Sequence, residues 1–478
     1  MGTVADVAVI GAGPNGLAAA IVLQEAGRSV VVYERSETVG GATATRELTL
    51  PGFRHDLGAA VHPLGAASPL FQTLQLEERG LQWLRADVPL AHPLAGSRAA
   101  TLHHSVTVTA DLLDEDGPLY QRVVGGIARR WELLADAVFG PVLRVPAHPI
   151  ELASFGLRGL WPASVAQRSL RTDEGRALLA GLAAHTPMPL NRPGNTAVAL
   201  VLAALAHVTG WPVARGGSQA IADALASVFQ ELGGTIETGR HINRLQELPP
   251  TGTVLFDTGP RAMAAIAGRG LGTRARRSYR RYHHGPGVFK ADFALDGPVP
   301  WDAVACRKAG TLHVGGTAEE IADAEQTAWS GRVPDRPFVI ASQPTVADPS
   351  RAPTGKHVLW TYCHVPGGSS TDMTNAIEQQ IERFAPGFRQ LILARHTMSP
   401  TDLENWNPNL VGGDIAGGRT DRFRLLVRPK LSLDPYKVGP GLYLCSSAAP
   451  PGPGVHGMSG YHAARAVLGP GDTDPAAG

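Results

Sequence analysis

The sequence predicts an α/β protein whose nucleotide-binding domain is assembled from separated stretches of the chain, with a second α+β domain inserted between them. Two observations carry this prediction: a strand, glycine turn, helix and strand that open the chain, and a further strand, glycine turn and helix near its end. The sequence between them shows helical patterns first and strand-like alternation afterwards.

The opening unit has the features of a dinucleotide-binding turn. An apolar strand, Asp6–Ile10, runs into Gly11–Gly16, which has the spacing GxGxxG. In such a turn the first glycine allows a sharp bend, the second lets the backbone approach a pyrophosphate, and the third lets the next helix pack closely. We expect that helix over Leu17–Ala26 and a second strand over Arg28–Tyr33. Glu34 then stands where an acid binds a ribose hydroxyl, which favours FAD or NAD over NADP.

Composition excludes several other classes of protein. The 478 residues are 44% hydrophobic and 18% charged, as in ordinary globular proteins. Lys and Arg number 43 against 42 Asp and Glu, so overall charge gives no indication of nucleic-acid binding. The three cysteines form no CxxC motif, which excludes a redox dithiol, and no metal-ligand set is expected. Because the first strand begins within six residues of the start, no signal peptide is expected.

A second glycine-rich unit lies near the end of the chain. A strand is expected over Gly441–Ser447, followed by the Pro- and Gly-rich turn Pro450–Gly460 and a helix over Tyr461–Leu468. A turn that leads into a helix N-terminus offers free backbone N–H groups and the positive end of a helix dipole. Both glycine turns are therefore expected to hold one dinucleotide.

Three motifs together resemble a known superfamily. They are the GxGxxG turn, the pair Gly40-Gly41, and the stretch Gly52–Gly58, which reads GF-x-x-D-x-G. They are similar to the FAD-dependent phytoene desaturase and amine oxidase superfamily, and most of all to its phytoene-dehydrogenase-like branch, which includes the pyridine-nucleotide-disulfide-oxidoreductase-domain proteins. Where many members carry an arginine that touches the FAD phosphates this chain has Ala42, and Arg46 is a candidate substitute.

The resemblance implies a glutathione-reductase-like FAD-binding domain of Rossmann type and a discontinuous substrate domain, an antiparallel sheet with a helical cap. The FAD domain is expected over 1–65, 210–285 and 405–470, the substrate domain over 66–209 and 286–404, and a disordered tail over 471–478. The motifs and the resemblance together imply the following FAD-binding residues: Gly11, Gly13, Pro14, Asn15, Gly16, Glu34, Arg35, Gly40, Gly41, Ala42, Thr43, Ile242, Ser447, Gly454, Val455, His456 and Met458.

The expected substrate domain contains several segments of predictable structure. Helices are expected over 69–76, 117–139, 164–184, 196–207 and 373–384, strands over 289–295, 310–314, 337–343 and 356–364, and a surface loop over 94–101. The apolar stretch Ala197–Val208 is too short to span a bilayer and is read as a buried or membrane-facing helix. Four aromatic residues either line an apolar channel or belong to the core: Trp131, Phe139, Phe155 and Trp161.

The candidates for acid–base chemistry are two histidines beside the expected flavin. His62 follows the GF-x-x-D-x-G stretch, and His456 lies inside the C-terminal turn. Imidazole titrates near neutral pH, so either residue could move a proton during C–H cleavage, or could instead hydrogen-bond the flavin or a backbone carbonyl. Tyr362 and His364 are further candidates, whereas Asp56 is expected to hold a loop.

The favoured function is an FAD-dependent oxidoreductase that desaturates, oxidises or isomerises C–C bonds of a hydrophobic, isoprenoid- or lipid-like substrate. The alternatives are an FAD-dependent oxidase of amines or other small molecules, and an FAD-binding scaffold protein without turnover. Because the sequence has no second GxGxxG for a nicotinamide domain, dioxygen or a quinone is the expected electron acceptor. A cytoplasmic location is expected, with peripheral membrane contact as an addition.

Overall fold

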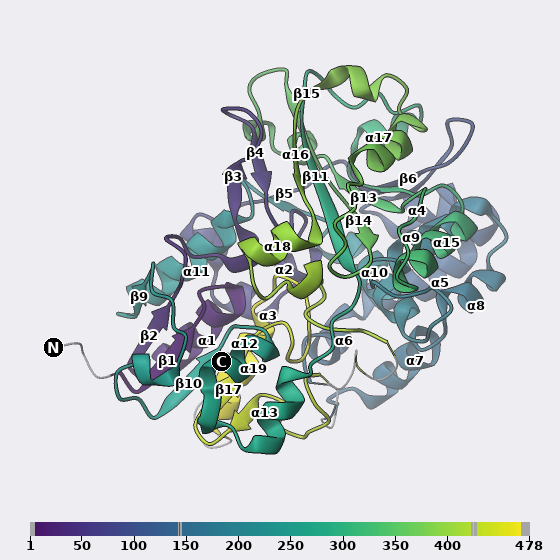
Figure 1. The fold of residues 1–478 in the computed structure, drawn as a ribbon. Coiled ribbons are helices and arrows are strands. Elements are labelled where there is room, and N and C mark those ends of the chain that lie inside the picture. Colours follow the sequence, from purple (N-terminus) through teal and green to yellow (C-terminus); the bar gives the residue numbers. More distant parts are fainter. Residues whose placement is uncertain (1–4, 142, 144–145, 422–423, 425–427, 470–478) are drawn as a thin grey trace.

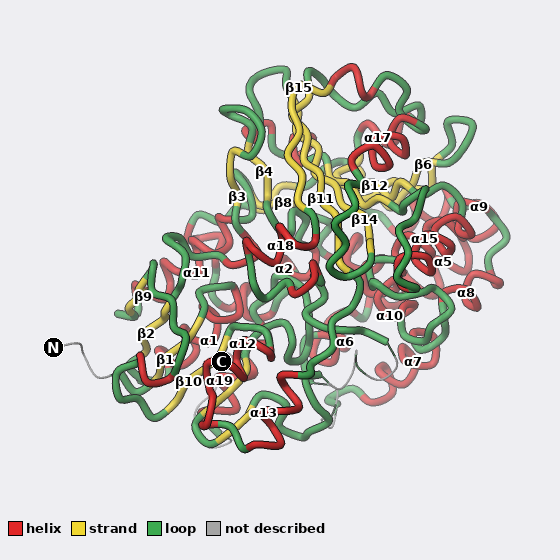
Figure 2. The backbone as a smooth tube through the Cα atoms, viewed as in Figure 1, coloured by secondary structure: helices red, strands yellow, loops and turns green. Residues whose placement is uncertain are grey.

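The computed structural model describes residues 5–141, 143, 146–421, 424 and 428–469. Its strands gather into two main sheets that occupy adjoining regions of the molecule (Figures 1 and 2). The first strand and the last helix lie in the same region (Figure 1), so the two ends of the chain build one domain. The tail predicted over 471–478 lies outside the described residues.

The first sheet is the predicted Rossmann-type sheet, parallel apart from its edge strand β16, which pairs antiparallel with β17. Its strands follow the order β16-β17-β10-β1-β2-β9, and β1 pairs in parallel with both β2 and β10. Every residue of β1 and β2 is buried, which explains their unbroken apolar sequences, VAVI and VVVY. The strands are β1 Val7–Ile10, β2 Val30–Tyr33, β9 Thr235–Glu237, β10 Thr253–Phe256, β16 Lys437–Gly439 and β17 Leu442–Leu444.

Three helices pack together in this domain. Helix α1 (Pro14–Glu25) contacts both α11 (Gln219–Glu231) and α19 (Met458–Leu468). Helix α19 begins at Met458, before the predicted start at Tyr461, because the left-handed Gly457 already ends the turn. Two further helices, α12 (Pro260–Ala267) and α13 (Thr273–Arg280), follow β10.

The second sheet belongs to the substrate domain and has the order β15-β11-β14-β13-β12-β6-β7. It is antiparallel apart from the pair β12 and β6. The four predicted strands are confirmed, but the loop predicted over 94–101 is wrong in part, because Ala99–Leu102 pairs with β6 at the edge of the sheet. The strands are β6 Val88–Pro93, β7 Ala99–Leu102, β11 Gly287–Leu295, β12 Ala309–Val314, β13 Val339–Ser342, β14 His357–Val365 and β15 Ile392–Met398.

Helices pack on both faces of the second sheet: α5, α9, α10 and α15 on the face of Val288 and Tyr362, and α17 on the face of Phe289 and Phe293 (Figure 1). The predicted helices over 117–139 and 164–184 are each divided, the first at Arg130 and the second before Asp173. The helices of this domain are α4 Val106–Leu112, α5 Gly117–Arg129, α6 Trp131–Val138, α7 Pro149–Gly159, α8 Ala163–Ala166, α9 Asp173–Ala183, α10 Asn195–Val208, α15 Ala318–Trp329, α17 Thr374–Glu382 and α18 Pro400–Trp406.

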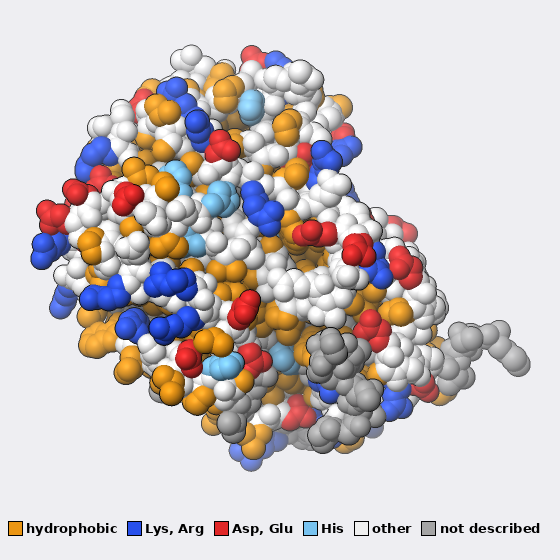
Figure 3. All heavy atoms as spheres, turned by 180° about the vertical axis from the view of Figure 1, so that it is seen from behind, with side chains coloured by type: hydrophobic (Ala, Val, Ile, Leu, Met, Phe, Trp, Pro, Cys, Tyr) orange, Lys and Arg blue, Asp and Glu red, His pale blue; other side chains and the backbone are white. Residues whose placement is uncertain are grey.

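The apolar stretch over 197–208 is a core helix. Most of α10 is buried, between α5, α7 and α9, so it presents no apolar face to a membrane. Across the described ranges, every helix is too short or too polar to cross a bilayer. Exposed apolar side chains occur instead at Ile150 and Leu157 of α7 and at Trp161 beyond it. The rear face of the molecule shows hydrophobic side chains interspersed with groups of Lys and Arg (Figure 3).

Candidate dinucleotide and substrate site

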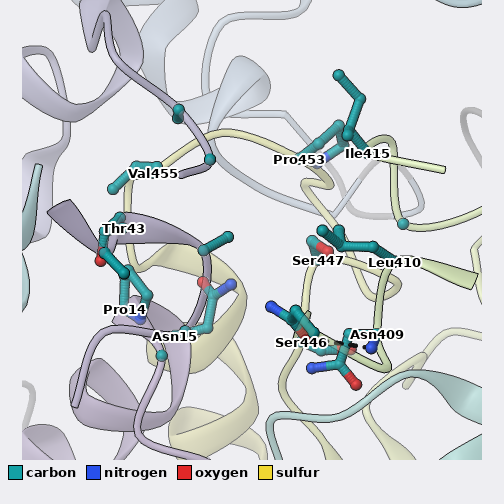
Figure 4. A pocket seen from close by; sticks show the side chains of 18 of the residues that line it. Pro14, Asn15, Thr43, Asn409, Leu410, Ile415, Ser446, Ser447, Pro453 and Val455 are labelled. Carbon is teal, nitrogen blue, oxygen red and sulfur yellow. Dashed lines mark hydrogen bonds between the residues drawn. The ribbon is translucent and has the colours of Figure 1, made fainter. Parts of the chain in front are cut away.

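Both glycine turns line one cavity of about 690 Å³. Figure 4 shows Pro14, Asn15 and Thr43 on one side of it, with Ser446 and Ser447 from the end of the chain on the other. The cavity continues past these residues to the face of the second sheet, where β11, β12, β13 and β14 contribute lining residues. It therefore has a dinucleotide half and a substrate half.

The two turns meet because helices α1 and α19 pack backbone to backbone. A Cβ atom at Gly460 of α19 would lie 1.9 Å from the carbonyl oxygen of Asn15 in α1, so any other residue would force the helices apart. Residues almost the whole chain apart are thereby fixed at one cavity, as the sequence predicted.

The first turn is held by two buried acids. Glu34 accepts hydrogen bonds from the backbone N–H of Ala12 (2.8 Å) and of Ser36 (2.8 Å). Asp257, the residue after β10, accepts one from the N–H of Gly16 (3.0 Å). Its Oδ2 atom lies 2.5 Å from where a Cβ of Gly13 would stand. A side chain at position 13 would therefore collide with Asp257 beneath the turn. Glycine at this position is also expected to let a ligand approach the backbone from above.

The residues of this half fit an adenine dinucleotide. The first turn of α1 carries no acid of its own, and its N-cap, Gly13, provides no side-chain cap; Asp257 accepts a hydrogen bond from the Gly16 N–H, and the positive end of the helix dipole remains beside the cavity for an anion. Asn15 Oδ1 and Thr258 Oγ1 are buried without a hydrogen-bond partner in the described part of the chain, and both residues line the cavity. Buried polar atoms normally have hydrogen-bond partners, so we expect these two atoms to form hydrogen bonds with a bound ligand.

We expect Asp257 to make dinucleotide binding sensitive to pH. Burial raises the pKa of its carboxyl group to about 7; the Gly16 N–H opposes this rise and the negative Glu34 adds to it. Below pH 7 the carboxyl group is neutral, and above pH 7 it places a negative charge beneath the turn that receives the pyrophosphate. We expect the affinity for FAD, measured by fluorescence titration, to fall severalfold as pH rises through about 7.

The control for this pH dependence is Asp257→Asn, which keeps an oxygen acceptor for the Gly16 N–H but cannot ionise. Its FAD affinity is expected to stay constant over the same pH range. A wild-type affinity that is flat, or that rises with pH, would contradict the assignment of Asp257.

The structure brings most of the predicted FAD-binding residues to the cavity. Those that line it are Gly11, Gly13, Pro14, Asn15, Glu34, Arg35, Gly41, Ala42, Thr43, Ile242, Ser447, Gly454 and Val455. Gly16, Gly40, His456 and Met458 are not among its lining residues. Gly16 instead packs on the turn itself, since its Cβ would lie 2.1 Å from the carbonyl oxygen of Gly11. Arg46 also lines the cavity.

His62 lines the cavity and has one free ring nitrogen. Its Nε2 atom lies 2.8 Å from the hydroxyl of Ser218, and that hydroxyl donates its proton to the carbonyl of Ala59 (2.6 Å). His62 must therefore carry its proton on Nε2, and Nδ1 has no partner among the described residues. Burial lowers the pKa of His62 to about 4, with Asp56 opposing and Arg351 adding to the effect, so the ring is neutral near pH 7.

The structure does not bring the second candidate, His456, to the cavity. Its ring is buried in the wall, against Phe139 (centroids 5.7 Å apart), and its Nδ1 atom accepts a hydrogen bond from the Met458 N–H (3.0 Å). The imidazole thus caps the start of α19. Both His456 and Met458 shape the turn, and neither is among the residues that line the cavity.

The aromatic residues of the substrate half differ from those considered in the sequence. Trp131 and Phe139 are core residues, Phe155 packs against the core, and Trp161 is exposed. Besides Tyr33 of β2, the Trp and Tyr residues that line the cavity are Trp211, Trp360, Tyr362 and Trp406. Of the two weaker candidates, Tyr362 lines the cavity, whereas His364 is paired with the buried Glu325 (2.9 Å).

The sequence analysis did not identify a buried ion pair in the same wall of the cavity. Lys290 of β11 lines the cavity, forms an ion pair with Asp292, and its Nζ lies 5.7 Å from the centre of the Trp360 ring. Burial lowers the pKa of Lys290 and raises that of Asp292 to about 6. The available signal was a Lys and an Asp at alternate positions of a strand that is otherwise apolar, which places both on the same face.

Asp56 holds the loops around the cavity, as expected. It is buried, forms an ion pair with Arg351 (2.8 Å), and accepts hydrogen bonds from the Thr45 hydroxyl (2.6 Å) and the Ser218 N–H (2.8 Å). Burial raises the pKa of Asp56, but Arg351 and these hydrogen bonds outweigh that effect and leave it below its ordinary value.

The Rossmann-type sheet and the glycine turns at the cavity define a nucleotide-binding domain, and comparisons with known proteins agree. The family model "NAD(P)-binding Rossmann-like domain" matches residues 9–75. Pyridine nucleotide-disulfide oxidoreductase domain-containing protein 2 of Rattus norvegicus is 27% identical over 97% of this chain and 93% of that protein. A limonene dehydrogenase polypeptide of Castellaniella defragrans is 35% identical over 24% of this chain and 20% of that protein.

Two solved structures share the fold. An oxidoreductase from Methanosarcina mazei has a TM-score of 0.63 and 19% identity over 97% of this chain and 99% of its own. Cyclohexylamine oxidase from Brevibacterium oxydans has a TM-score of 0.57 and 16% identity over 97% and 98%. The predicted resemblance to pyridine nucleotide-disulfide oxidoreductase domain-containing proteins is confirmed by the rat protein, and an amine oxidase is among the proteins that share the fold. The chain thus contains a Rossmann-like nucleotide-binding domain, and the proteins it is similar to are named as oxidoreductases, a dehydrogenase and an oxidase.

Proposed function

We propose that the protein is an FAD-dependent oxidoreductase that desaturates, oxidises or isomerises C–C bonds of a hydrophobic, isoprenoid- or lipid-like substrate. The observation that carries this proposal is the continuous cavity, which starts between the two glycine turns and ends against apolar and aromatic side chains of the second sheet. The partial match to a protein named as a limonene dehydrogenase supports the same substrate class.

The charges of the cavity favour this substrate over an amine. Among the described residues, the acids that line the cavity are Glu34 and Asp257, and both belong to the dinucleotide half. The substrate half carries the cation Lys290 and neutral histidines instead. An ammonium group would meet no counter-charge there and would be desolvated at a cost.

The alternative, an FAD-dependent amine oxidase, is favoured by one observation. Trp360 and Tyr362 stand on the same face of β14 with ring centroids 5.2 Å apart, which provides an aromatic pair next to the cavity. Release of hydrogen peroxide on addition of a primary amine, with no conversion of terpenoid hydrocarbons or alcohols, would establish this alternative. The third hypothesis, an FAD-binding scaffold, requires bound flavin that no substrate of either class reduces.

The lining of the cavity suggests separate roles for FAD and for the residues of the chain in the proposed reaction. FAD, when bound, accepts or returns the electrons of the C–H bonds that are broken or formed. The chain's own residues hold the substrate between apolar walls, exclude water, and provide the neutral His62. Its free Nδ1 atom is proposed to accept a proton at the cleaved carbon or to return one.

The flavin and its electron partner can be tested by absorption spectroscopy. Purified protein is expected to be yellow, to bleach with dithionite in the absence of oxygen, and to respond poorly to NADPH, because the sequence provides no second nucleotide turn. Mass spectrometry of molecules that co-purify with the protein would identify the substrate class. Rapid bleaching by NADPH alone would contradict the inferred electron acceptor.

A further inference from the structure

A pair of histidines lies at the end of the substrate half, where neither the motifs nor the proposed reaction assigns a role. His185, which follows α9, lines the cavity, and its Nε2 atom is 2.9 Å from Nε2 of His313 in β12. Its ring also packs edge-on against Trp211, with centroids 5.6 Å apart. The ring of His185 is thus held in place by contacts with both His313 and Trp211.

The β-sheet register places this pair in line with the other polar groups of the wall. His313 lies opposite Ile340, Ile340 opposite Tyr362, and Tyr362 opposite Lys290. Register neighbours share a face of the sheet, so the row crosses the wall of the substrate half from Lys290 to His313. His313 stands two strands from Tyr362, about 10 Å away.

The contacts of the pair determine its protons. Only one proton can lie between two Nε2 atoms at this distance, so one ring donates and the other accepts. His313 is fully buried and its Nδ1 atom, which has no hydrogen-bond partner in the described structure, faces Gly181 of α9, where a Cβ would stand 2.5 Å away. An N–H directed at a helix backbone with no acceptor would be costly. His313 therefore carries its proton on Nε2 and donates it to His185.

His185 in turn must carry its proton on Nδ1, the nitrogen that remains for a ligand in the cavity. Burial lowers the pKa of His185 to about 3, with His364 adding to the effect, so the ring is neutral and acts as a hydrogen-bond donor. Among the described residues no carboxylate lines this half of the cavity, and the one hydrogen bond of the His185 ring is that of Nε2 to His313, so an oxygen of the ligand can serve as the acceptor for Nδ1.

We propose that His185, oriented by His313, donates a hydrogen bond to a hydroxyl or carbonyl oxygen at one end of an otherwise apolar substrate. This inference deepens the proposed function, on which it rests, because it names the substrate class as an oxygenated isoprenoid- or lipid-like molecule. His185 is the residue that touches the substrate, and His313 positions it.

Calorimetric titration with matched probes tests the site. Geraniol, geranial, geranylamine and the hydrocarbon 2,6-dimethylocta-2,6-diene share a carbon skeleton and differ in the terminal group. The wild-type protein, as purified, is expected to bind geraniol and geranial roughly 3- to 10-fold more tightly than the hydrocarbon, the value of one net hydrogen bond. Geranylamine should show no such gain.

Variants of the two histidines distinguish the loss of the hydrogen bond to the ligand from a loss of ring packing in the wall. His185→Phe keeps an aromatic ring beside Trp211, and we expect it to remove the preference for oxygen without changing the affinity for the hydrocarbon. His185→Gln, which keeps an N–H donor, should retain part of the preference, and His313→Phe should reduce it. His148→Phe, at an exposed position before α7, is the control and should behave as wild type.

Two results would overturn the inference: equal affinity of wild type for the alcohol, the aldehyde and the hydrocarbon, or a preference that survives in His185→Phe. Tightest binding of geranylamine would also overturn it. A colourless protein that still prefers geraniol through His185 would refute the proposed function and leave this site standing. A yellow protein that shows no preference for geraniol would refute this site and leave the proposed function standing.

Discussion

Gly13→Val is expected to yield a folded protein that has lost most of its affinity for FAD. The new Cβ would lie 2.5 Å from Oδ2 of Asp257 beneath the turn, so the branched side chain would displace the backbone that is expected to receive the pyrophosphate. Overpacking of this kind costs about 1–3 kcal/mol, which predicts roughly 10- to 100-fold weaker binding in a fluorescence titration with FAD. Circular dichroism checks the fold of the variant.

The matched control is Gly126→Val in α5. A Cβ at Gly126 would meet no heavy atom within 4 Å, and this glycine does not line the cavity. Gly126→Val is expected to bind FAD as wild type does. Full flavin occupancy in Gly13→Val would show that the dinucleotide does not pass over this turn.

Arg351→Ala is expected to destabilise the protein by about 3–5 kcal/mol, because it leaves the carboxylate of Asp56 buried and unpaired. Both side chains are about 1% exposed, and Arg351 also donates to the carbonyl of Arg54 (3.1 Å). The ion pair joins the hairpin β3 (Thr45–Glu47) and β4 (Arg54–Asp56), near the first glycine turn, to a loop that precedes β14. Urea denaturation measures the loss.

An exposed ion pair provides the comparison. Arg336 pairs with Glu320 at the surface, and Arg336→Ala should change the stability by less than about 1 kcal/mol. The pH dependence gives a second check. The lowered pKa of Asp56 means that its contribution is present above the unfolded pKa, about 3.9, and is lost as pH falls through the folded value. Equal losses in the two variants would contradict the assignment of Asp56 and Arg351.

The dinucleotide half could be predicted from the sequence because its motifs are local. The spacing of Gly11, Gly13 and Gly16 and the apolar strands on either side follow from short-range geometry, and the structure has the predicted elements at these places. The residues around Gly454 and Val455 were predicted in the same way, from a turn that precedes a helix.

The residues that could not be predicted depend on contacts between distant segments. Asp257 reaches the glycine turn because β10 pairs with β1 in a register that sets Phe256 beside Ile10. Lys290 and Tyr362 are opposite each other only through the pairing of β11 and β14. His456 shows the converse, since its place in the C-terminal turn was predicted correctly but its ring turns away from the cavity to cap α19.

Hydrogen–deuterium exchange on addition of FAD tests most directly whether the two glycine turns hold one dinucleotide. We predict that one FAD per chain slows exchange in peptides that cover both Gly11–Leu17 and Gly452–Ser459, with little change around the exposed helix α7. Protection of the first segment alone, or a second flavin needed to protect the other, would contradict this prediction.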